Sequence, residues 1–422
     1  MTAVLDVTVT TEQRAGLGTE RRAGNHADTH EYLPGSVLRG ALAAPWVRQG
    51  RQNEPAFRRT FDGDLRFGPL LPEQSQIRPV SAHVCKYQRP GCTSTVRDAA
   101  FEGDFGECAT CGRRDPGRGE LVAPGGRPWR ARQPLTTAAI DPVTQIAADG
   151  QLFSRDALPP RTVFRGQVHG PAVALAALAG THRVRLGGRG SVMGAATVTL
   201  QPADQVAPAL EPGVTVLVAA SPVVLVDDAG RPSFDVRTEL RRHGVVLAPS
   251  GVRAWIRLLP AGVGGWHAAS GLPKPVTPAL AAGSTWAVDV DDPAPLQRLL
   301  DRGFGLRRQE GFGWVEVEKQ AWRPAPAVFV ADAVDSPDSY QAWQDHLAAL
   351  ALGRDHLLFV EDLLRDRSVG TDAAVGSVLA RPRARGLSEP QRARLWSVLV
   401  GLGSEATRLA LADWLREQAR MR

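Results

Sequence analysis

Two glycine- and arginine-rich stretches decide the fold of this chain: RLGGRGSVMGAATV at residues 185–198 and GLRRQEGFGWVEV at residues 305–317. Each stretch runs into alternating apolar and polar residues, which predicts a β-strand directly after a glycine-rich turn. Glycine lets another backbone approach closely, and the arginine guanidinium grips a phosphate with two parallel hydrogen bonds. The pair indicates an RNA-backbone binder built from two related modules, although glycines that only form tight turns would give the same pattern.

Secondary-structure patterns follow a similar order before each stretch. The first half is predicted as strand, helix, insertion, strands, helix and strand, with the main patterns at residues 3–11, 34–50, 60–134, 162–170, 171–180 and 196–200. The second half carries strand, helix, two strands, helix and strand at residues 213–226, 237–244, 251–260, 283–292, 295–303 and 312–318. Both halves fit the βαββαβ order of a ferredoxin-like, RRM-like fold. We therefore predict an α+β protein whose two modules span residues 1–205 and 212–322.

The four cysteines of the chain lie close together in the sequence, as Cys85, Cys92, Cys108 and Cys111. They fall in a stretch at about residues 60–134 that is rich in Gly, Pro and Arg and has few periodic apolar residues, which indicates an insertion into the first module. Two thiolates two residues apart can bind one tetrahedral ion, so the spacing predicts a structural zinc finger. Disulfides are the alternative, and His83 is an alternative ligand.

Composition favours an anionic partner. The formal net charge is +6, the pI is about 9.6, and only three of the 50 basic residues are lysines. No apolar run approaches the roughly 20 residues that a membrane-spanning helix needs. The N-terminal sequence MTAVLDVTVTTEQ alternates as a strand does and lacks the basic start of a secretory signal. We expect a cytoplasmic protein that does not enter a membrane.

The C-terminal residues 327–422 have a different pattern, with apolar residues at intervals of three and four. This spacing predicts an α-helical domain. Its three tryptophans, Trp343, Trp396 and Trp414, are predicted to be core residues.

Several stretches resemble the RAMP superfamily of CRISPR effector subunits. YLPGSVLRGALA at residues 32–43 resembles the superfamily's helix-initiating signature, and GFGWV at 311–315 resembles its late glycine-rich loop. In order along the chain, further stretches resemble the type III-D subunit that carries two RAMP modules: LRFGPLLP at 65–72, DGQLFSRDALPPRTVFRGQV at 149–168, VRLGGRGSVMGAATV at 184–198, GLPKP at 271–275, AGSTW at 282–286 and GLRRQEGFGWVEV at 305–317. The resemblance covers about residues 1–320.

The resemblance implies a non-catalytic subunit of an antiviral ribonucleoprotein that holds the 5′ repeat-derived tag of the CRISPR RNA (crRNA). Its implied partners are the crRNA, the large polymerase-like subunit and the RAMP backbone subunits, with target RNA contacted indirectly. The sequence agrees with a scaffold role, because it shows no Ser/His/Asp constellation, no GxxxxGK[ST] phosphate loop and no Rossmann fingerprint.

The predicted RNA contacts lie in the signature helix, the two glycine-rich loops and basic segments near them. Carried over residue by residue, the resemblance gives Arg39, Arg189, Arg307, Arg308 and Phe312. The rest of the predicted RNA-binding set is Arg21, Arg22, His30, Arg165, Arg185, Gly188, Lys274, Gly311 and Gly313. Trp314 is an alternative platform on which a base would stack.

Two other functions remain open. The first is an endoribonuclease, because His26, Asp28 and His30 lie in a predicted polar loop at residues 16–30, where a histidine can act as general acid or base on a 2′-hydroxyl attack. The corresponding loop of RAMP backbone subunits carries the aspartate implicated in target RNA cleavage. The second is a purely structural subunit, whose C-terminal helices bind other proteins and whose RNA contact is incidental.

Overall fold

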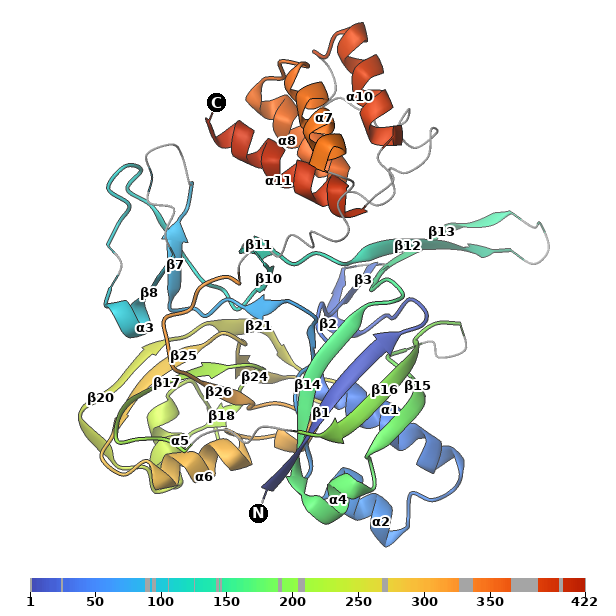
Figure 1. The fold of residues 1–422 in the computed structure, drawn as a ribbon. Helices are drawn as coiled ribbons and strands as arrows, with labels where there is room; N and C mark the ends of the chain where they lie inside the picture. Colours follow the sequence, from blue (N-terminus) through green and yellow to red (C-terminus); the bar gives the residue numbers. More distant parts are fainter. Residues whose placement is uncertain are drawn as a thin grey trace. The chain divides into compact units, whose positions relative to one another are not determined.

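The computed structural model describes residues 2–23, 26–87, 92, 96–104, 106–124, 126–141, 144, 146–188, 192–203, 209–267, 272–325, 337–365, 386–401 and 405–421. The chain forms two compact units, and the fold mixes α-helices with several separate β-sheets (Figure 1). The larger unit consists of Met1–Lys86, Ser94–Glu107 and Arg113–Pro326, and the smaller of Tyr87–Thr93, Cys108–Gly112 and Ala327–Arg422. No helix within the described ranges is long and apolar enough to cross a membrane.

The first sheet of the larger unit is antiparallel and pairs the N-terminal strand with strands far along the chain. Its strand order is β15-β16-β1-β14-β4, and β5 also pairs with β14. In chain order, this sheet and its helices are β1 (Thr2–Thr11), α1 (Gly35–Arg48), β4 (Arg66–Phe67), β5 (Leu71–Pro72), β14 (Val163–Pro171), α4 (Ala172–Ala176), β15 (Gly180–Arg185) and β16 (Ala195–Pro202). The stretch at 60–134 that was predicted as insertion therefore supplies β4 and β5 to the first sheet.

The alternation along β1 explains which face of this sheet is buried. Leu5, Val7 and Val9 are at most 4% exposed and pack in one core with Leu38 and Leu42 of α1. Each such side chain contributes roughly 1.5–3 kcal/mol when it is fully buried. The helices α1 and α4 thus cover one face of the first sheet.

The second sheet is also antiparallel, with the strand order β20-β25-β17-β26. In chain order, this sheet and its helices are β17 (Gly213–Ala219), α5 (Val236–Arg242), β20 (Leu247–Trp255), β25 (Thr285–Val290), α6 (Ala294–Arg302) and β26 (Val315–Glu318). Its core contains Leu240 of α5, Leu296 of α6 and the stacked rings of Trp286 and Phe304. Three short ribbons extend this half: β18 (Leu225–Val226) with β19 (Pro232–Ser233), β21 (Leu258–Val263) with β24 (Thr277–Leu280), and β22 (Trp266–His267) with β23 (Leu272–Pro273).

The predicted polar loop at residues 16–30 instead contains two strands, which is a correction to the sequence prediction. These are β2 (Gly18–Ala23) and β3 (His26–Thr29), and they join β12 (Gln133–Ile140) and β13 (Ala147–Ala157) in a sheet of order β12-β13-β3-β2. Strand β13 pairs in parallel with β3, so that Ser154 lies opposite His26. Strands β2 and β3 pair with each other, and β3 also pairs with the distant β13, a pairing that a local apolar pattern does not reveal.

The insertion between β5 and β12 forms two small three-stranded sheets of order β8-β7-β9 and β11-β10-β6. Its elements are β6 (Gln76–Ile77), β7 (Ala82–Cys85), β8 (Arg97–Asp98), α3 (Ala99–Glu102), β9 (Arg114–Pro116), β10 (Leu121–Ala123) and β11 (Arg127–Pro128). Ala100 of α3 packs against Val216 of β17 and Ala287 of β25. The insertion therefore lies against a face of the second sheet.

The smaller unit contains four described helices: α7 (Pro337–Ala348), α8 (Arg354–Arg365), α10 (Glu389–Gly401) and α11 (Glu405–Met421). Arg365 of α8 pairs with Asp413 of α11 at 2.8 Å. Trp343 and Trp414 pack against the core of these helices, as predicted for core residues. The side chain of Trp396 lies outside the described part of the chain.

Candidate nucleic-acid interface

The second glycine-rich loop leads from α6 to β26 and is fixed by contacts with the protein's own backbone. Gly311 has a φ of +87°, and a Cβ atom there would lie 2.6 Å from the Phe67 carbonyl oxygen and 2.9 Å from the Gly35 Cα. A Cβ atom on Gly313 would lie 1.8 Å from the Phe304 carbonyl oxygen. These two glycines are therefore required by the packing of the loop, whether or not RNA binds there.

The same contacts bring the loop to the N-terminus of α1. A Cβ atom on Gly35 would lie 1.9 Å from the Phe67 carbonyl oxygen, so α1 and the loop approach this strand together. Arg39 of α1 donates to the Phe61 carbonyl oxygen at 2.7 Å and pairs with Asp62 at 2.9 Å. The side chain of Gln309 donates to the Gly63 carbonyl oxygen, in the same turn, at 3.3 Å. The turn at 61–63 thus joins Arg39 to the loop.

Three predicted RNA contacts of this loop are engaged within the protein. Arg307 has a left-handed φ of +58°, donates to the Val263 and Gly264 carbonyl oxygens, and pairs with Glu310 at 2.9 Å. Lys274 also pairs with Glu310, at 2.8 Å. Burial raises the pKa of Glu310, but hydrogen bonds from Arg307 and Lys274 outweigh it and lower this pKa. The Arg307 guanidinium lies 4.9 Å from the centre of the Phe312 ring.

Arg308 differs from Arg307. It begins the short 3₁₀ helix η2 (Arg308–Glu310) and is half-buried, and its side chain forms no ion pair or hydrogen bond within the described part of the chain. Its positive charge acts on Arg66, whose pKa is lowered to about 10 by burial and then by Arg308. Of the two arginines in this loop, Arg308 is the one whose guanidinium is available to a phosphate.

Arg66 was not singled out from the sequence, yet it joins the two sheets at this loop. It is 8% exposed on β4 and donates to the Leu300 and Asp301 carbonyl oxygens in the last turn of α6. Its guanidinium lies 4.7 Å from the centre of the Trp314 ring, and His169 contacts the same ring at 4.5 Å. Trp314 is 7% exposed, and its role as an alternative stacking platform stays a prediction.

The first glycine-rich loop joins β15 to β16. Cβ atoms on Gly187 and Gly194 would lie 2.1 and 2.3 Å from the carbonyl oxygens of Gly16 and Leu186, so both glycines serve tight backbone packing. Gly188 faces open space, and Arg189 lies outside the described residues. Arg185 is exposed and donates to the Gln13 side chain at 2.9 Å.

The remaining predicted RNA contacts lie elsewhere in the larger unit. Arg21 and Arg22 belong to β2, and their side chains are outside the described part. Arg165 on β14 exposes 61% of its side chain and pairs with Glu73 at 2.7 Å. Burial, aided by the charge of Arg132, lowers the pKa of His30 to about 4. His30 is therefore uncharged near pH 7 and does not offer the positive charge that a phosphate contact requires.

The four cysteines come together as the sequence predicts. Their Sγ atoms all lie within 4.8 Å of one another, and none of the four forms a disulfide. The turn after Cys108 is closed by the Gly112 amide, which donates to the Cys108 carbonyl oxygen at 2.7 Å. Gly112 has a φ of +63°, which favours glycine at this position. Four thiolate donors match a closed tetrahedral metal site in number and type.

A second group of possible ligands lies where β3 meets β13. His26 Nε2 is 3.0 Å from Asp28 Oδ1 and 3.8 Å from Asp156 Oδ2, and His26 Nδ1 is 2.8 Å from Ser154 Oγ. Asp156 was not predicted as a site residue, because only the pairing of β3 with β13 brings it beside His26. The ligand atoms of these three residues lie within 4.8 Å of one another, a spacing at which one metal ion can contact all three.

Comparisons with known proteins give low overall similarity. No protein-family profile matches the chain, and no curated protein matches it in sequence. A chain of the type III-B Cmr-beta structure bound to cognate target RNA and AMPPnP is 13% identical with a TM-score of 0.39, covering 67% of this chain and 86% of that one. CRISPR-associated protein Cas6 is 9% identical with a TM-score of 0.31, covering 76% and 100%. Cmr4 (Cas7) from Pyrococcus furiosus is 11% identical with a TM-score of 0.24, covering 47% and 100%.

Proposed function

We propose that this chain is a non-catalytic crRNA-binding subunit of a type III, and specifically type III-D, CRISPR effector complex in antiviral defence. In this role it holds the 5′ repeat-derived tag and contacts the large polymerase-like subunit and the first RAMP backbone subunit. The strand orders support two ferredoxin-like modules, because β16-β1-β14-β4 and β26-β17-β25-β20 both place the fourth, first, third and second strands of a βαββαβ unit side by side.

The observation that carries this proposal is the backbone contact between Gly311 and Gly35. These residues belong to the two short motifs on which the family resemblance depends, and they are far apart in the sequence. At their meeting point α1 begins without an acidic residue in its first turn and without a side-chain cap. The N-terminus of such a helix attracts anions, and Arg308 adds a guanidinium beside it. The positive end of the helix dipole and the Arg308 guanidinium both favour the binding of an RNA phosphate group.

The test compares the two arginines of the second loop. We expect Arg308→Ala to weaken crRNA binding about tenfold and to lower the salt slope of binding by about 1, because a phosphate contact is lost. Fluorescence anisotropy of a labelled crRNA at several salt concentrations measures both. Arg298→Ala, on the exposed side of α6, is the matched control. Unchanged affinity and slope in Arg308→Ala would contradict the assignment of this loop.

For the insertion, we infer one structural zinc ion held by Cys85, Cys92, Cys108 and Cys111. The distances between the sulfur atoms support a single shared ion, and thiolates are soft ligands that suit zinc. With four protein ligands the ion would keep no position for a reacting water. Its contribution would be to fold the insertion.

The second candidate function is an endoribonuclease, which the group of His26, Asp28 and Asp156 favours. Ser154 orients the imidazole of His26, and Asp28 and Asp156 flank its other ring nitrogen. Such an imidazole can accept a proton from a 2′-hydroxyl that attacks the neighbouring phosphate. Labelled repeat and target RNAs should be incubated with the wild type, Asp28→Ala and Asp156→Ala, with and without EDTA. Cleavage by the wild type that both variants lose would establish this function, and no wild-type product would exclude it.

A further inference from the structure

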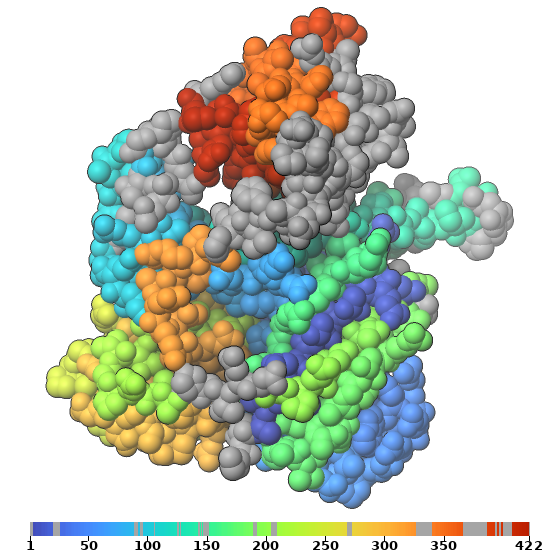
Figure 2. Space-filling view, in the orientation of Figure 1, coloured from blue at the N-terminus to red at the C-terminus, as the bar shows by residue number. Residues whose placement is uncertain are grey.

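The two sheets of the larger unit differ in how their faces are covered. The insertion lies against the second sheet through Ala100, and Arg253 of β20 donates to the Ala100 carbonyl oxygen at 3.4 Å. On the first sheet, the face opposite α1 and α4 carries polar residues that alternate with the core residues, among them Asp6, Thr8 and Gln167. Figure 2 shows strands of this face at the molecular surface. We refer to this polar face of the first sheet as the open face.

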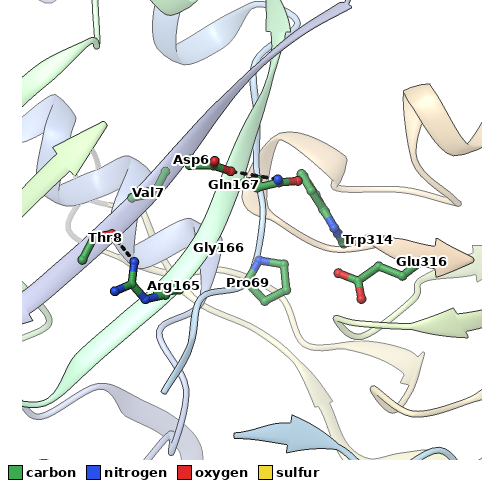
Figure 3. Close-up of a pocket in the computed structure, with 9 residues that line it drawn as sticks. All are labelled: Asp6, Val7, Thr8, Pro69, Arg165, Gly166, Gln167, Trp314 and Glu316. Atoms are coloured by element: carbon green, nitrogen blue, oxygen red, sulfur yellow. Dashed lines mark hydrogen bonds between the residues drawn. The ribbon is translucent and has the colours of Figure 1, made fainter. Parts of the chain in front are cut away.

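One end of this open face is hollowed. The hollow has a volume of about 460 Å³ and lies where β1 and β14 of the first sheet meet β26 of the second (Figure 3). Asp6 and Thr8 line it from β1, Arg165 and Gln167 from β14, and Trp314 and Glu316 from the other side, with Pro69 completing the wall.

The charges that line the hollow are mainly negative. Asp6 accepts a hydrogen bond from Gln167 at 2.9 Å, but neither Asp6 nor Glu316 forms an ion pair within the described part of the chain. Arg165 is the one cationic side chain among the lining residues, and it is already paired with Glu73 and bonded to Thr8. Asp6 and Glu316 therefore face the hollow without a compensating cation. Burial raises the pKa of Glu316, and a positive group that enters the hollow would stabilise its charged form.

The apolar residues that line the hollow favour one kind of positive group over others. Trp314 and Pro69 form an apolar wall close to the Glu316 carboxylate (Figure 3). An arginine side chain has a methylene stem that packs on such a wall and a planar fork that donates two hydrogen bonds to a carboxylate. A lysine fits less well, because its ammonium group is a point charge that binds water strongly.

We propose that this hollow receives an arginine side chain of another protein that docks on the open face of the first sheet. The proposal goes beyond the RNA-binding role, because it assigns the open sheet face to a protein partner. The partner would contact Trp314 and Glu316, at the end of the second glycine-rich stretch, as well as the open face of the first sheet. Charge complementarity of this kind also raises the rate of association and fixes the register of the partner.

The test uses the full chain and N-acetyl-arginine methylamide as the probe. Saturation-transfer difference NMR should show transfer to the δ-methylene protons of this probe and at least threefold less to the neutral citrulline analogue. This comparison needs no variant. Equal transfer to the two compounds would overturn the proposal.

Substitutions of the two carboxylates test whether the arginine probe binds in the hollow. Asp6→Asn combined with Glu316→Gln should reduce transfer to the arginine probe at least threefold, whereas Asp291→Asn, which removes an exposed carboxylate elsewhere, should leave it unchanged. Unchanged transfer in the double variant would overturn the proposal. Weaker crRNA binding by the double variant would make the hollow an RNA site, and this result would also overturn it.

Discussion

Arg66 shows how much a single buried side chain contributes to the junction of the two modules. It comes from β4, a strand of two residues, and reaches the last turn of α6, where backbone carbonyl groups lack partners within the helix. The guanidinium satisfies two of these carbonyl groups and carries the positive charge that the C-terminus of a helix attracts. Both bonds are donated by one guanidinium nitrogen, Nη1.

We expect Arg66→Ala to lower the free energy of unfolding by about 3 kcal/mol, because two hydrogen bonds from a charged donor and the contact with Trp314 are lost together. Urea unfolding followed by tryptophan fluorescence measures this change. Arg302→Ala, on the exposed part of the same helix turn, should change the free energy of unfolding by less than about 0.5 kcal/mol. Equal effects of the two substitutions would contradict the role of Arg66.

His169 makes the same junction sensitive to acid. Burial, followed by the charge of Arg66, lowers the pKa of His169 from 6.5 to about 4. The unfolded chain therefore binds a proton near pH 6.5 while the folded chain does not, and stability is lost as the pH falls from 6.5 to 4. The loss is up to about 3 kcal/mol. His169→Phe keeps a ring against Trp314 and should lose less stability between pH 7 and pH 4.5. Identical pH profiles in urea would refute this explanation.

The elements with a strong periodic pattern could be predicted, and the short or long-range ones could not. Leu5, Val7 and Val9 alternate with polar residues, and β1 forms where that alternation predicts it. By contrast, β4 and β5 are two residues long each, too short to leave a pattern. The group formed by His26 and Asp156 depends on the parallel pairing of β3 with β13, and no local sequence feature specifies that pairing.

The sequence predicts that the glycines of the two loops make room for RNA, but in the structure they make room for the protein's own backbone. Gly187, Gly194, Gly311 and Gly313 all meet the protein's own backbone, whereas the prediction gave them the task of admitting RNA. Arg307 likewise binds Glu310 and two carbonyl oxygens. We therefore expect Arg307→Ala to lower stability, and this separates it from Arg308→Ala, which should lower RNA affinity alone.

The insertion should depend on its metal. Metal analysis of the purified chain is expected to return about one zinc per molecule, and Cys111→Ser should reduce this value. Because binding of a structural zinc is coupled to folding, a strong chelator should raise hydrogen exchange in residues 76–128 and leave the amides of α11 unchanged. Slow exchange at 76–128 in a metal-free protein would show that the four cysteines do not hold a structural ion.

Within the larger unit, the two sheets have the same strand order but differ in what covers their faces. One sheet is covered by the insertion and the other keeps a polar face with a negatively charged hollow. The second glycine-rich loop and the start of α1 offer a positive helix end and Arg308. The two proposals, RNA at the loop and a protein partner on the open sheet, both depend on this distribution of charge. The sequence could suggest two modules, but only the packing between them shows that their faces are not equivalent.

The most direct test of the RNA-end assignment is the affinity of the full chain for two RNAs of equal length at one fixed salt concentration. One carries the repeat-derived tag at its 5′ end, and the other carries the same tag nucleotides in scrambled order. Phosphate contacts are common to both RNAs, so any difference reports recognition of the tag itself. We predict that the tagged RNA binds at least about tenfold more tightly, the size of one or two specific base contacts. Equal affinities would contradict the claim that this chain holds the 5′ tag.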